Sequence, residues 1–315
     1  MTRRRRKMNT SKQEMPWLRL GLSAVVGLGL AISAVATPIL ASEALASESE
    51  PSLKFTAIPD QNTTELQEKF NTLASHLTKV LSVKVEYVPS RDYQASVEMF
   101  KNGDVDLAWF GGLTGVQARA AVAGSSAIAQ GDSDPKYYSY FIAHKDTGLK
   151  KSDEFPKDIG KFKFTFGSQS STSGRLMPEY FIRKNTGKAP SEFFKEPVGF
   201  SGSHDKTAEL VASGQYQVGV LNFKVYDDLV AKGKLDPNVV QIIWKTPEYA
   251  DYNWTAHPQI ETRLGKGFTQ KLQSALTAID KPELLSAILR QKLISAKNED
   301  FDSIVAVAKD LNMLR

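Results

Sequence analysis

The residue types best suited to chemistry form a hydroxyl-rich turn at positions 168–174, with the sequence Ser-Gln-Ser-Ser-Thr-Ser-Gly. A strand expected to end at Phe166 runs into this turn, and an expected helix follows it. The free N–H groups at the start of that helix, with the hydroxyls of Ser171, Thr172 and Ser173, would surround an anion with donors. One serine or threonine at a helix start is an ordinary N-cap, but several in succession favour a site for a tetrahedral oxyanion.

A second hydroxyl-rich helix start lies at residues 201–205, with the sequence Ser-Gly-Ser-His-Asp. An imidazole such as His204 can donate a hydrogen bond to an anion, and as an imidazolium it would favour the more highly charged anion. Asp205 would accept a hydrogen bond only from a ligand that still carries a proton, so it could discriminate between oxyanions. Alternatively, Asp205 only interacts with the helix dipole in the first turn.

A third candidate is the end of an expected buried strand at residues 106–110, which two glycines follow. Ligands of open α/β sheets bind at the carboxyl ends of strands. We therefore expect Phe110 and Gly111 to contact the ligand, whereas Trp109 is assigned to core packing.

A scaffold in which strand and helix patterns alternate must position these three segments. The alternation predicts an α/β fold with parallel, doubly wound sheets, and its second start near Lys163 predicts two lobes with a ligand cleft between them. We expect the chain to cross between the lobes near residues 142–150 and 244–252. The first lobe would be discontinuous, at residues 53–143 and 250–315, and the second lobe would span residues 144–249. A helical C-terminal tail is expected, with helices near residues 264–279, 283–293 and 304–311.

Several kinds of chemistry have no support in the sequence. The chain has no cysteine, and its four histidines are not paired at metal-ligand spacing. It also lacks the glycine-rich phosphate loops of nucleotide-binding proteins and the G-x-S-x-G turn of serine hydrolases. We therefore expect no metal, no cofactor and no catalytic residue.

The N-terminus predicts export. A basic head at residues 3–7 precedes an apolar run at residues 18–35, and Ala44-Leu45-Ala46 is a small-x-small cleavage pattern. We expect a signal peptide over residues 1–46, a short flexible leader at residues 47–52 and a mature protein in the periplasm. A permanent membrane anchor is the alternative, although a run of this length is marginal for a spanning helix. The choice between ordinary secretion and twin-arginine export stays open.

Removal of the signal would change the charge of the protein. The full chain holds 40 basic and 35 acidic residues, and residues 1–46 contain seven and two of these, which leaves 33 of each. The formal net charge of the mature chain would thus be zero, which argues against nucleic-acid binding.

These motifs, in this order, resemble those of the periplasmic phosphonate/phosphite-binding proteins of ABC transporters. The resemblance covers roughly residues 53–260. It rests on Asp92-Tyr93, DLAWFGGLTGVQAR at 106–119, FGSQSSTSGRLMPEYF at 166–181, SGSHD at 201–205 and VGVLN at 218–222. The later YNWT at 252–255 is similar to a branch described as selenate-binding.

The resemblance implies a type II periplasmic-binding fold and a set of ligand contacts. The implied contacts are Ser171, Thr172, Ser173, Tyr93, His204, Asp251 and either Tyr138 or its neighbour Tyr137, of which we select Tyr138. We add Asp205, Phe110, Gly111 and Asn222. Family members that hold an amino-phosphonate carry a glutamate after the strand that matches residues 218–222, but this chain continues Asn-Phe-Lys-Val-Tyr. A ligand ammonium group would therefore lack one partner.

We expect the mature chain to be the periplasmic binding component of an ABC importer. It would be a monomer that captures a small phosphorus oxyanion and delivers it to a permease in the membrane. A selenate-like anion is the second candidate ligand. An enzyme and a ligand-sensing domain on the same fold are alternatives of another class.

Overall fold

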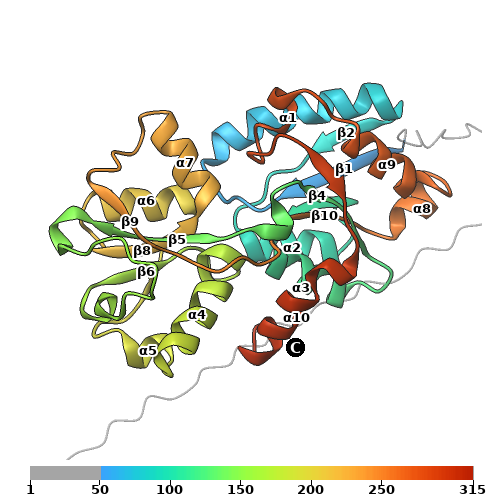
Figure 1. Cartoon of the computed structure of the whole chain (residues 1–315). Coiled ribbons are helices and arrows are strands. Elements are labelled where there is room, and N and C mark those ends of the chain that lie inside the picture. The colour runs from blue at the N-terminus through green and yellow to red at the C-terminus, as the bar shows by residue number, and fades with distance from the viewer. Residues whose placement is uncertain (1–50, 315) are drawn as a thin grey trace, which may run out of the picture. The chain divides into compact units, whose positions relative to one another are not determined.

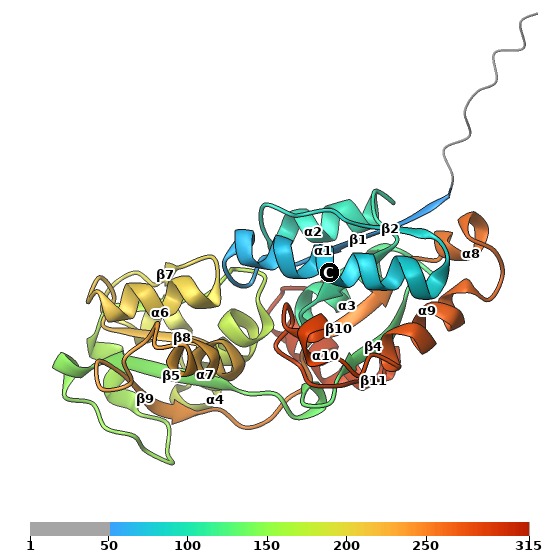
Figure 2. The ribbon, with the colours of Figure 1, turned by 90° about the horizontal axis from the view of Figure 1, so that it is seen from above.

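The computed structural model describes residues 51–314 (Figure 1). The predicted signal peptide, with its cleavage site after Ala46, lies outside these residues. Two sheets, each with helices on both faces, make up the described part (Figure 2). The α/β class predicted from the sequence is confirmed. No helix within residues 51–314 has both the length and the apolar composition that a membrane span needs.

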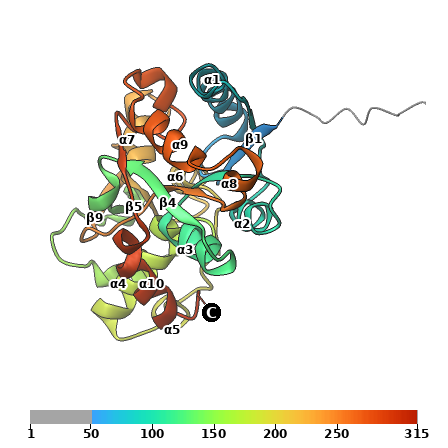
Figure 3. The same cartoon turned by 90° about the vertical axis from the view of Figure 1, so that its right-hand side faces the viewer.

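The first sheet has six strands in the spatial order β11-β4-β10-β3-β1-β2. They are β1 (Ser52–Ala57), β2 (Lys84–Tyr87), β3 (Leu107–Phe110), β4 (Ser126–Gly131), β10 (Asn253–Ala256) and β11 (Leu293–Ser295). Helices α1 and α9 cover one face, and α2 and α3 cover the other, with α10 against α3 (Figure 3). The helices are α1 (Thr63–Leu81), α2 (Tyr93–Lys101), α3 (Gly112–Ala121), α8 (Gln259–Arg263), α9 (Phe268–Thr277) and α10 (Asp302–Asp310).

The second sheet has five strands in the order β7-β6-β8-β5-β9. They are β5 (Ser139–His144), β6 (Phe164–Phe166), β7 (Gly199–Phe200), β8 (Val218–Asn222) and β9 (Val240–Lys245). Helices α6 and α7 lie on one face, and α4 and α5 lie on the other (Figure 1). These helices are α4 (Met177–Thr186), α5 (Pro190–Phe193), α6 (His204–Ala212) and α7 (Phe223–Ala231).

Both sheets are mixed, which corrects the expectation of parallel sheets. Strand β10 runs antiparallel to β3 and β4, and β5 runs antiparallel to β8 and β9. Each is the first strand that the chain enters after leaving the other sheet, through short links at 132–138 and 246–252. The starts of β5 and β10 therefore lie at the edge where β1, β3, β6 and β8 end.

The two links also locate the passages between the sheets. The second passage lies within the predicted region 244–252. The first passage lies before the predicted region 142–150, because β5 already pairs within the second sheet. A boundary drawn between the sheets would fall before Ser139 and not after residue 143. The division into lobes otherwise stays a prediction.

Helix α1 shows how the sequence builds the first lobe. Its apolar residues recur every three or four positions and are buried, as the pattern predicts. The side chain of Asn62 accepts a hydrogen bond from the Glu65 N–H at 3.1 Å and caps the start. The helix ends at Ser82, whose φ of 56° is left-handed. Phe70 on the buried face stacks on Tyr87 at 4.8 Å.

The C-terminal end is helical, but the helix expected at residues 283–293 is absent from the described structure. A single 3-10 turn, Pro282–Leu285, and strand β11 take its place. Pro282 starts the turn, and Leu289 has a left-handed φ of 52°, which an α-helix cannot contain.

Truncation of Phe70 should destabilise the first lobe. Phe70 also packs against Phe55 and Trp254, so we expect Phe70→Ala to lower the free energy of unfolding by about 3–5 kcal/mol. Urea denaturation measures this as a lower midpoint. Val80 lies on the same helix but is 47% exposed, and Val80→Ala should change stability by less than about 0.5 kcal/mol. Equal losses in the two variants would contradict the assigned buried face.

Candidate functional site

The candidate site lies where the two sheets face each other through their strand ends. Buried residues that gather there come from six segments beside strand ends or strand starts and from two helix starts. The six segments are Asp60 after β1, Gly111 and Gly112 after β3, residues 171–173 after β6, Asn222 at the end of β8, Tyr137 before β5, and Asp251 and Tyr252 before β10. The helix starts contribute Tyr93 of α2 and His204 of α6. The position agrees with the rule that α/β proteins bind ligands beyond the carboxyl ends of their strands.

Three residues of the hydroxyl-rich turn are buried, and one of them caps the helix that follows. Ser171, Thr172 and Ser173 are each at most 2% exposed. Ser171 does cap the helix, because its hydroxyl accepts a hydrogen bond from the Gly174 N–H at 2.9 Å. Capping needs only that one hydroxyl. The turn Thr172–Leu176 is π-helical, a form often found at functional sites.

The start of helix α3 meets this turn from the first sheet. The N–H of Leu113 donates to the Thr172 hydroxyl at 2.9 Å, and the N–H of Gly112 donates to Oδ1 of Asp251 at 2.9 Å. Gly111 lies at the closest approach, because a Cβ there would be 3.1 Å from the Thr172 hydroxyl. Gly111 thus lies beside this cluster, and its contact with a ligand stays a prediction. Phe110 is fully buried against Phe100 and belongs to the core instead.

Asp251 is a fully buried carboxyl group. Burial raises the pKa of Asp251 to about 7, against the opposing effects of the Gly112 N–H and the Thr172 hydroxyl. Its Oδ2 atom has no hydrogen-bond partner among the described residues. Near neutral pH this group can therefore accept or donate a hydrogen bond.

His204 is fully buried, which disfavours the imidazolium form that the sequence analysis considered. Burial lowers the pKa of His204 to about 3. Its Nδ1 accepts a hydrogen bond from the Asn222 N–H at 3.3 Å, so the proton is assigned to Nε2. That atom lies 3.4 Å from the hydroxyl of Tyr252.

Tyr252 connects three partners across the site. Its hydroxyl donates to Oδ2 of Asp60 at 2.9 Å and accepts from Nδ2 of Asn222 at 2.9 Å. Asn222 also caps helix α7, because its Oδ1 accepts from the Val225 N–H. The predicted contact Asn222 is therefore at the site, but its side chain holds Tyr252. Burial raises the pKa of Asp60 to about 6, although the bond from Tyr252 opposes this.

Two further tyrosines have buried hydroxyl groups without a hydrogen-bond partner in the described part of the chain, Tyr93 and Tyr137. Burial raises the pKa of Tyr93 well above its usual range, and the nearby Ser171 hydroxyl opposes this. The ring of Tyr137 contacts that of Tyr252 at 5.3 Å. With Oδ2 of Asp251 they form three unsatisfied groups, and such groups are costly unless a ligand or water pairs with them.

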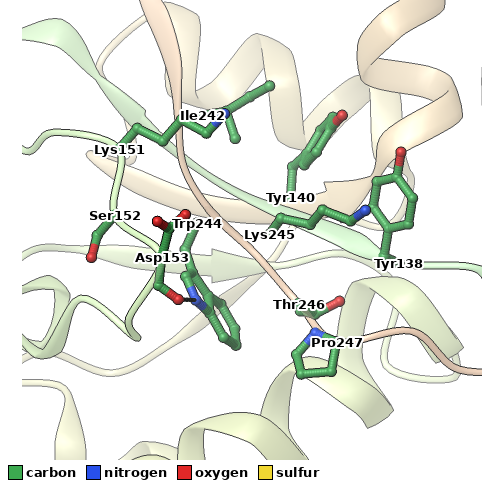
Figure 4. A pocket seen from close by; sticks show the side chains of 10 residues that line it. All are labelled: Tyr138, Tyr140, Lys151, Ser152, Asp153, Ile242, Trp244, Lys245, Thr246 and Pro247. Carbon is green, nitrogen blue, oxygen red and sulfur yellow. Dashed lines mark hydrogen bonds between the residues drawn. The ribbon is translucent and has the colours of Figure 1, made fainter.

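The structure does not bring Tyr138 or Asp205 into this cluster. Tyr138 stacks on Phe223 at 4.0 Å, with Lys245 Nζ 3.6 Å from its ring centre, in a pocket on the second sheet (Figure 4). Successive residues of an extended chain point to opposite sides, so Tyr137 takes the inward position. Asp205 is only half-buried, and its carboxylate accepts from the Ser203 hydroxyl and the Lys206 N–H.

Asp60 and Tyr252 were missed as site residues by the sequence analysis. Asp60 follows β1 after only Ile58 and Pro59, so the same strand-end rule that selected Gly111 could have found it. Tyr252 stands in the YNWT string, but no property of that string alone indicates which side chain points inward.

Comparisons with known proteins agree with this geometry. The model of a family described as "ABC transporter, phosphonate, periplasmic substrate-binding protein" matches residues 55–301. The "Probable ABC transporter phosphite binding protein PhnD1" of Prochlorococcus marinus is 39% identical over 270 residues, which cover 84% of this chain and 91% of the relative. The "Phosphate-import protein PhnD" of Mycolicibacterium smegmatis is 30% identical, over 68% of this chain and 70% of the relative.

A solved structure of PhnD1 from Prochlorococcus marinus in complex with methylphosphonate has a TM-score of 0.79 and covers 83% of this chain and 98% of that chain. Two α/β lobes with a polar site between them therefore define a periplasmic binding protein of the type II fold, as predicted. The chain belongs to the family of periplasmic substrate-binding proteins of phosphonate ABC transporters.

The ligand-free protein should lose stability as pH rises through the titration of Asp251. Its pKa of about 7 lies above that of an unfolded aspartate, so the native state keeps a proton that the unfolded state releases. The contribution of this proton to the free energy of unfolding is on the order of a few kcal/mol. It is fully present below about pH 4 and is lost by about pH 7. In Asp251→Asn the loss should vanish.

The measurement is the difference in unfolding free energy between wild type and variant from pH 4 to 8. Asp60 and His204 are present in both proteins, so their contributions to the pH dependence cancel in this difference. The contribution of Asp60 is similar to that of Asp251. That of His204 is opposite, because its lowered pKa makes stability fall as the pH drops below about 6.5. Asp158 is exposed, and Asp158→Asn is the control that should leave the curve unchanged in shape. A difference that does not vary with pH for Asp251→Asn would show that the carboxyl group is not strained by burial.

Proposed function

We propose that this chain is the periplasmic component of an ABC importer and captures a small phosphorus oxyanion. The observation that carries the proposal is the set of three buried, unsatisfied groups, the hydroxyls of Tyr93 and Tyr137 and Oδ2 of Asp251. Tyr93 lies near the Ser171 hydroxyl, and Asp251 lies near the Thr172 hydroxyl and the Gly112 N–H at the start of helix α3. The ring of Tyr137 contacts that of Tyr252. An oxyanion would accept hydrogen bonds from the donors and so satisfy them.

The carboxyl groups of Asp251 and Asp60 favour one class of oxyanion when they are ionised. A carboxylate accepts a hydrogen bond only from a ligand that still carries a proton, as singly protonated phosphite or methylphosphonate does. A fully deprotonated dianion such as selenate would face repulsion from these buried groups. The related protein of Prochlorococcus marinus has been solved with methylphosphonate, and that of Mycolicibacterium smegmatis carries the name of a phosphate importer. Both ligands belong to this class.

We further propose that the site binds and does not catalyse. A histidine whose pKa is about 3 is a poor general base near neutral pH, and His204 is the histidine of the site. The hydroxyl of Ser171 is engaged in capping. Reversible capture by many hydrogen bonds suits a transport receptor, because the lobes can close on the ligand and reopen at the permease.

Location and assembly complete the proposal. We expect cleavage after Ala46, release into the periplasm as a monomer, and delivery of the ligand to a membrane permease. The head, apolar run and cleavage pattern of residues 1–46 support export.

Removal of single hydroxyls from the turn should weaken ligand binding. Thr172→Ala and Ser173→Ala each delete one donor to a buried anion, at a cost of roughly 1.5–3 kcal/mol, or about ten- to a hundredfold in affinity. Calorimetric titration with phosphite and methylphosphonate measures the change. Ser170→Ala is the matched control, because Ser170 lies in the same turn but is not buried. Affinity that stays at the wild-type value in both test variants would reduce the turn to a capping motif.

A carboxyl group should decide which oxyanion is accepted. We infer that this group is Asp251 and not Asp205, because Asp251 is fully buried and its Oδ2 has no hydrogen-bond partner among the described residues. We expect wild type to prefer phosphite and methylphosphonate over selenate. Asp251→Asn should narrow this preference by about tenfold or more, because the repulsion of dianions is removed. Titrations with phosphite, methylphosphonate, 2-aminoethylphosphonate, phosphate and selenate measure the ranking.

Asp205→Asn is the control for this experiment, since its carboxylate is bonded within its own helix start. It should leave the ranking as in wild type. A wild-type preference for selenate, or a ranking that changes in Asp205→Asn and not in Asp251→Asn, would contradict the assignment.

A further inference from the structure

An ion pair lies buried behind the tyrosines of the site, between Arg290 and Asp134. Arg290 is 4% exposed, and Asp134 is fully buried. The Nε and Nη2 atoms of Arg290 donate to Oδ1 of Asp134 at 2.9 and 2.5 Å. The other oxygen, Oδ2, accepts from the Gly131 N–H at 2.6 Å. Both carboxylate oxygens are therefore engaged, so neither is available to a ligand.

The guanidinium group of Arg290 also contacts three aromatic rings. Its central carbon lies 4.9 Å from the ring centre of Tyr252, 5.0 Å from that of Tyr137 and 5.7 Å from that of Trp109. Cation–π contacts of this kind strengthen when they are desolvated. A planar cation fixed by Asp134 thus provides a rigid support for two of the phenol rings of the site.

The same pair connects the two links between the sheets. Asp134 and Tyr137 lie on the first link, and Tyr252 lies on the second. The backbone carbonyl of Asp134 accepts a hydrogen bond from the Asp251 N–H at 3.1 Å. Asp134 therefore fixes the backbone of the unsatisfied carboxyl group as well as the cation behind the tyrosines.

Stability alone is a weak explanation for this arrangement. An apolar pair of similar volume is often as stable as a buried ion pair or more so. The neighbouring Leu289 adopts a left-handed φ of 52°, which is unfavourable for a branched side chain. Arg290 Nη1 donates to the carbonyl of Ile288 at 2.5 Å. The strained turn at Leu289 therefore fixes the position of the guanidinium group.

We infer that Arg290 and Asp134 are positioning residues that hold Tyr137, Tyr252 and Asp251 in the geometry that receives the oxyanion. The inference rests on the proposed function, because it assigns a support to that same site. It differs from simple attraction of the anion by a distant cation, and the two explanations predict opposite results.

Two variants separate geometry from charge. Arg290→Lys keeps the positive charge but loses the planar fork, and Asp134→Asn removes a negative charge near the site. Attraction by charge predicts unchanged affinity in Arg290→Lys and tighter binding in Asp134→Asn. Positioning predicts weaker binding in both, by roughly ten- to a hundredfold, as is common when an outer-shell partner is lost. Calorimetric titration with phosphite and methylphosphonate measures the affinities.

A third variant moves the pair without changing any charge. A Cβ on Gly131 would lie 2.5 Å from Cδ of Arg290 and 2.6 Å from Oδ2 of Asp134, so Gly131→Ala must displace them. It should also weaken binding. The matched control is Arg263→Lys, because Arg263 pairs with the buried Asp106, which precedes β3 at the edge of the sheet away from the site. Thermal unfolding identifies which variants are folded.

A fourth measurement tests whether the effect acts through the tyrosines. Arg290→Lys should weaken binding much less in a Tyr137→Phe, Tyr252→Phe background than in wild type, because the hydroxyls that it positions are already absent. Equal weakening in both backgrounds would contradict the inference. Wild type that binds neither phosphite nor methylphosphonate would overturn the proposed function. Wild type that binds, with folded Arg290→Lys, Asp134→Asn and Gly131→Ala that bind equally well, would overturn this inference alone.

Discussion

Burial of the Asp251 carboxyl group is the constraint on which the rest of the structure depends. A carboxyl group without water must be surrounded by donors, and here the donors come from both sheets. Gly112 supplies an N–H from the first sheet, and the Thr172 hydroxyl approaches from the second. This arrangement is possible only if the two sheets meet through their strand ends. The antiparallel entry of β5 and β10 achieves this, since it places the start of each next to the ends of its neighbours.

Burial shifts the pKa values of three ionisable groups of the candidate site in the direction that favours their neutral forms. His204 has a pKa of about 3, and the pKa values of Asp60 and Asp251 are raised to about 6 and 7. Arg290 stays charged but is paired with Asp134 behind aromatic rings. An entering monoanion thus meets hydroxyl, amide and phenol donors and no direct counter-ion. Neutral donors bind an anion tightly enough for capture, while a buried ion pair would make release more costly.

The sequence predicted the elements of this site better than the side chains within it. The turn at residues 171–173, Gly111 and His204 were found because a strand end followed by a helix start is visible in the sequence. The choice between Tyr138 and Tyr137 failed because the segment lies outside a regular strand. The alternation of side chains along a strand therefore could not indicate which tyrosine points inward. Asp205 was selected because it belongs to the hydroxyl-rich helix start at residues 201–205. Asp60 was not considered, because the burial that makes it unusual depends on tertiary packing. Arg290, 156 positions from Asp134, left no local pattern at all.

Several polar contacts join the two lobes, which has a consequence for transport. Three of these contacts lie away from the two links. The N–H of Leu113 donates to the Thr172 hydroxyl, and the N–H of His204 donates to the Asp60 carbonyl at 3.0 Å. Lys234 and Glu65 form an ion pair at 2.7 Å. Such bonds exchange readily with water, and the exposed ion pair adds little. These bonds therefore contribute little net free energy to closure. A ligand that satisfies the buried phenols and the Asp251 carboxyl group would supply favourable free energy for closure. The closed state would then indicate that the site is occupied.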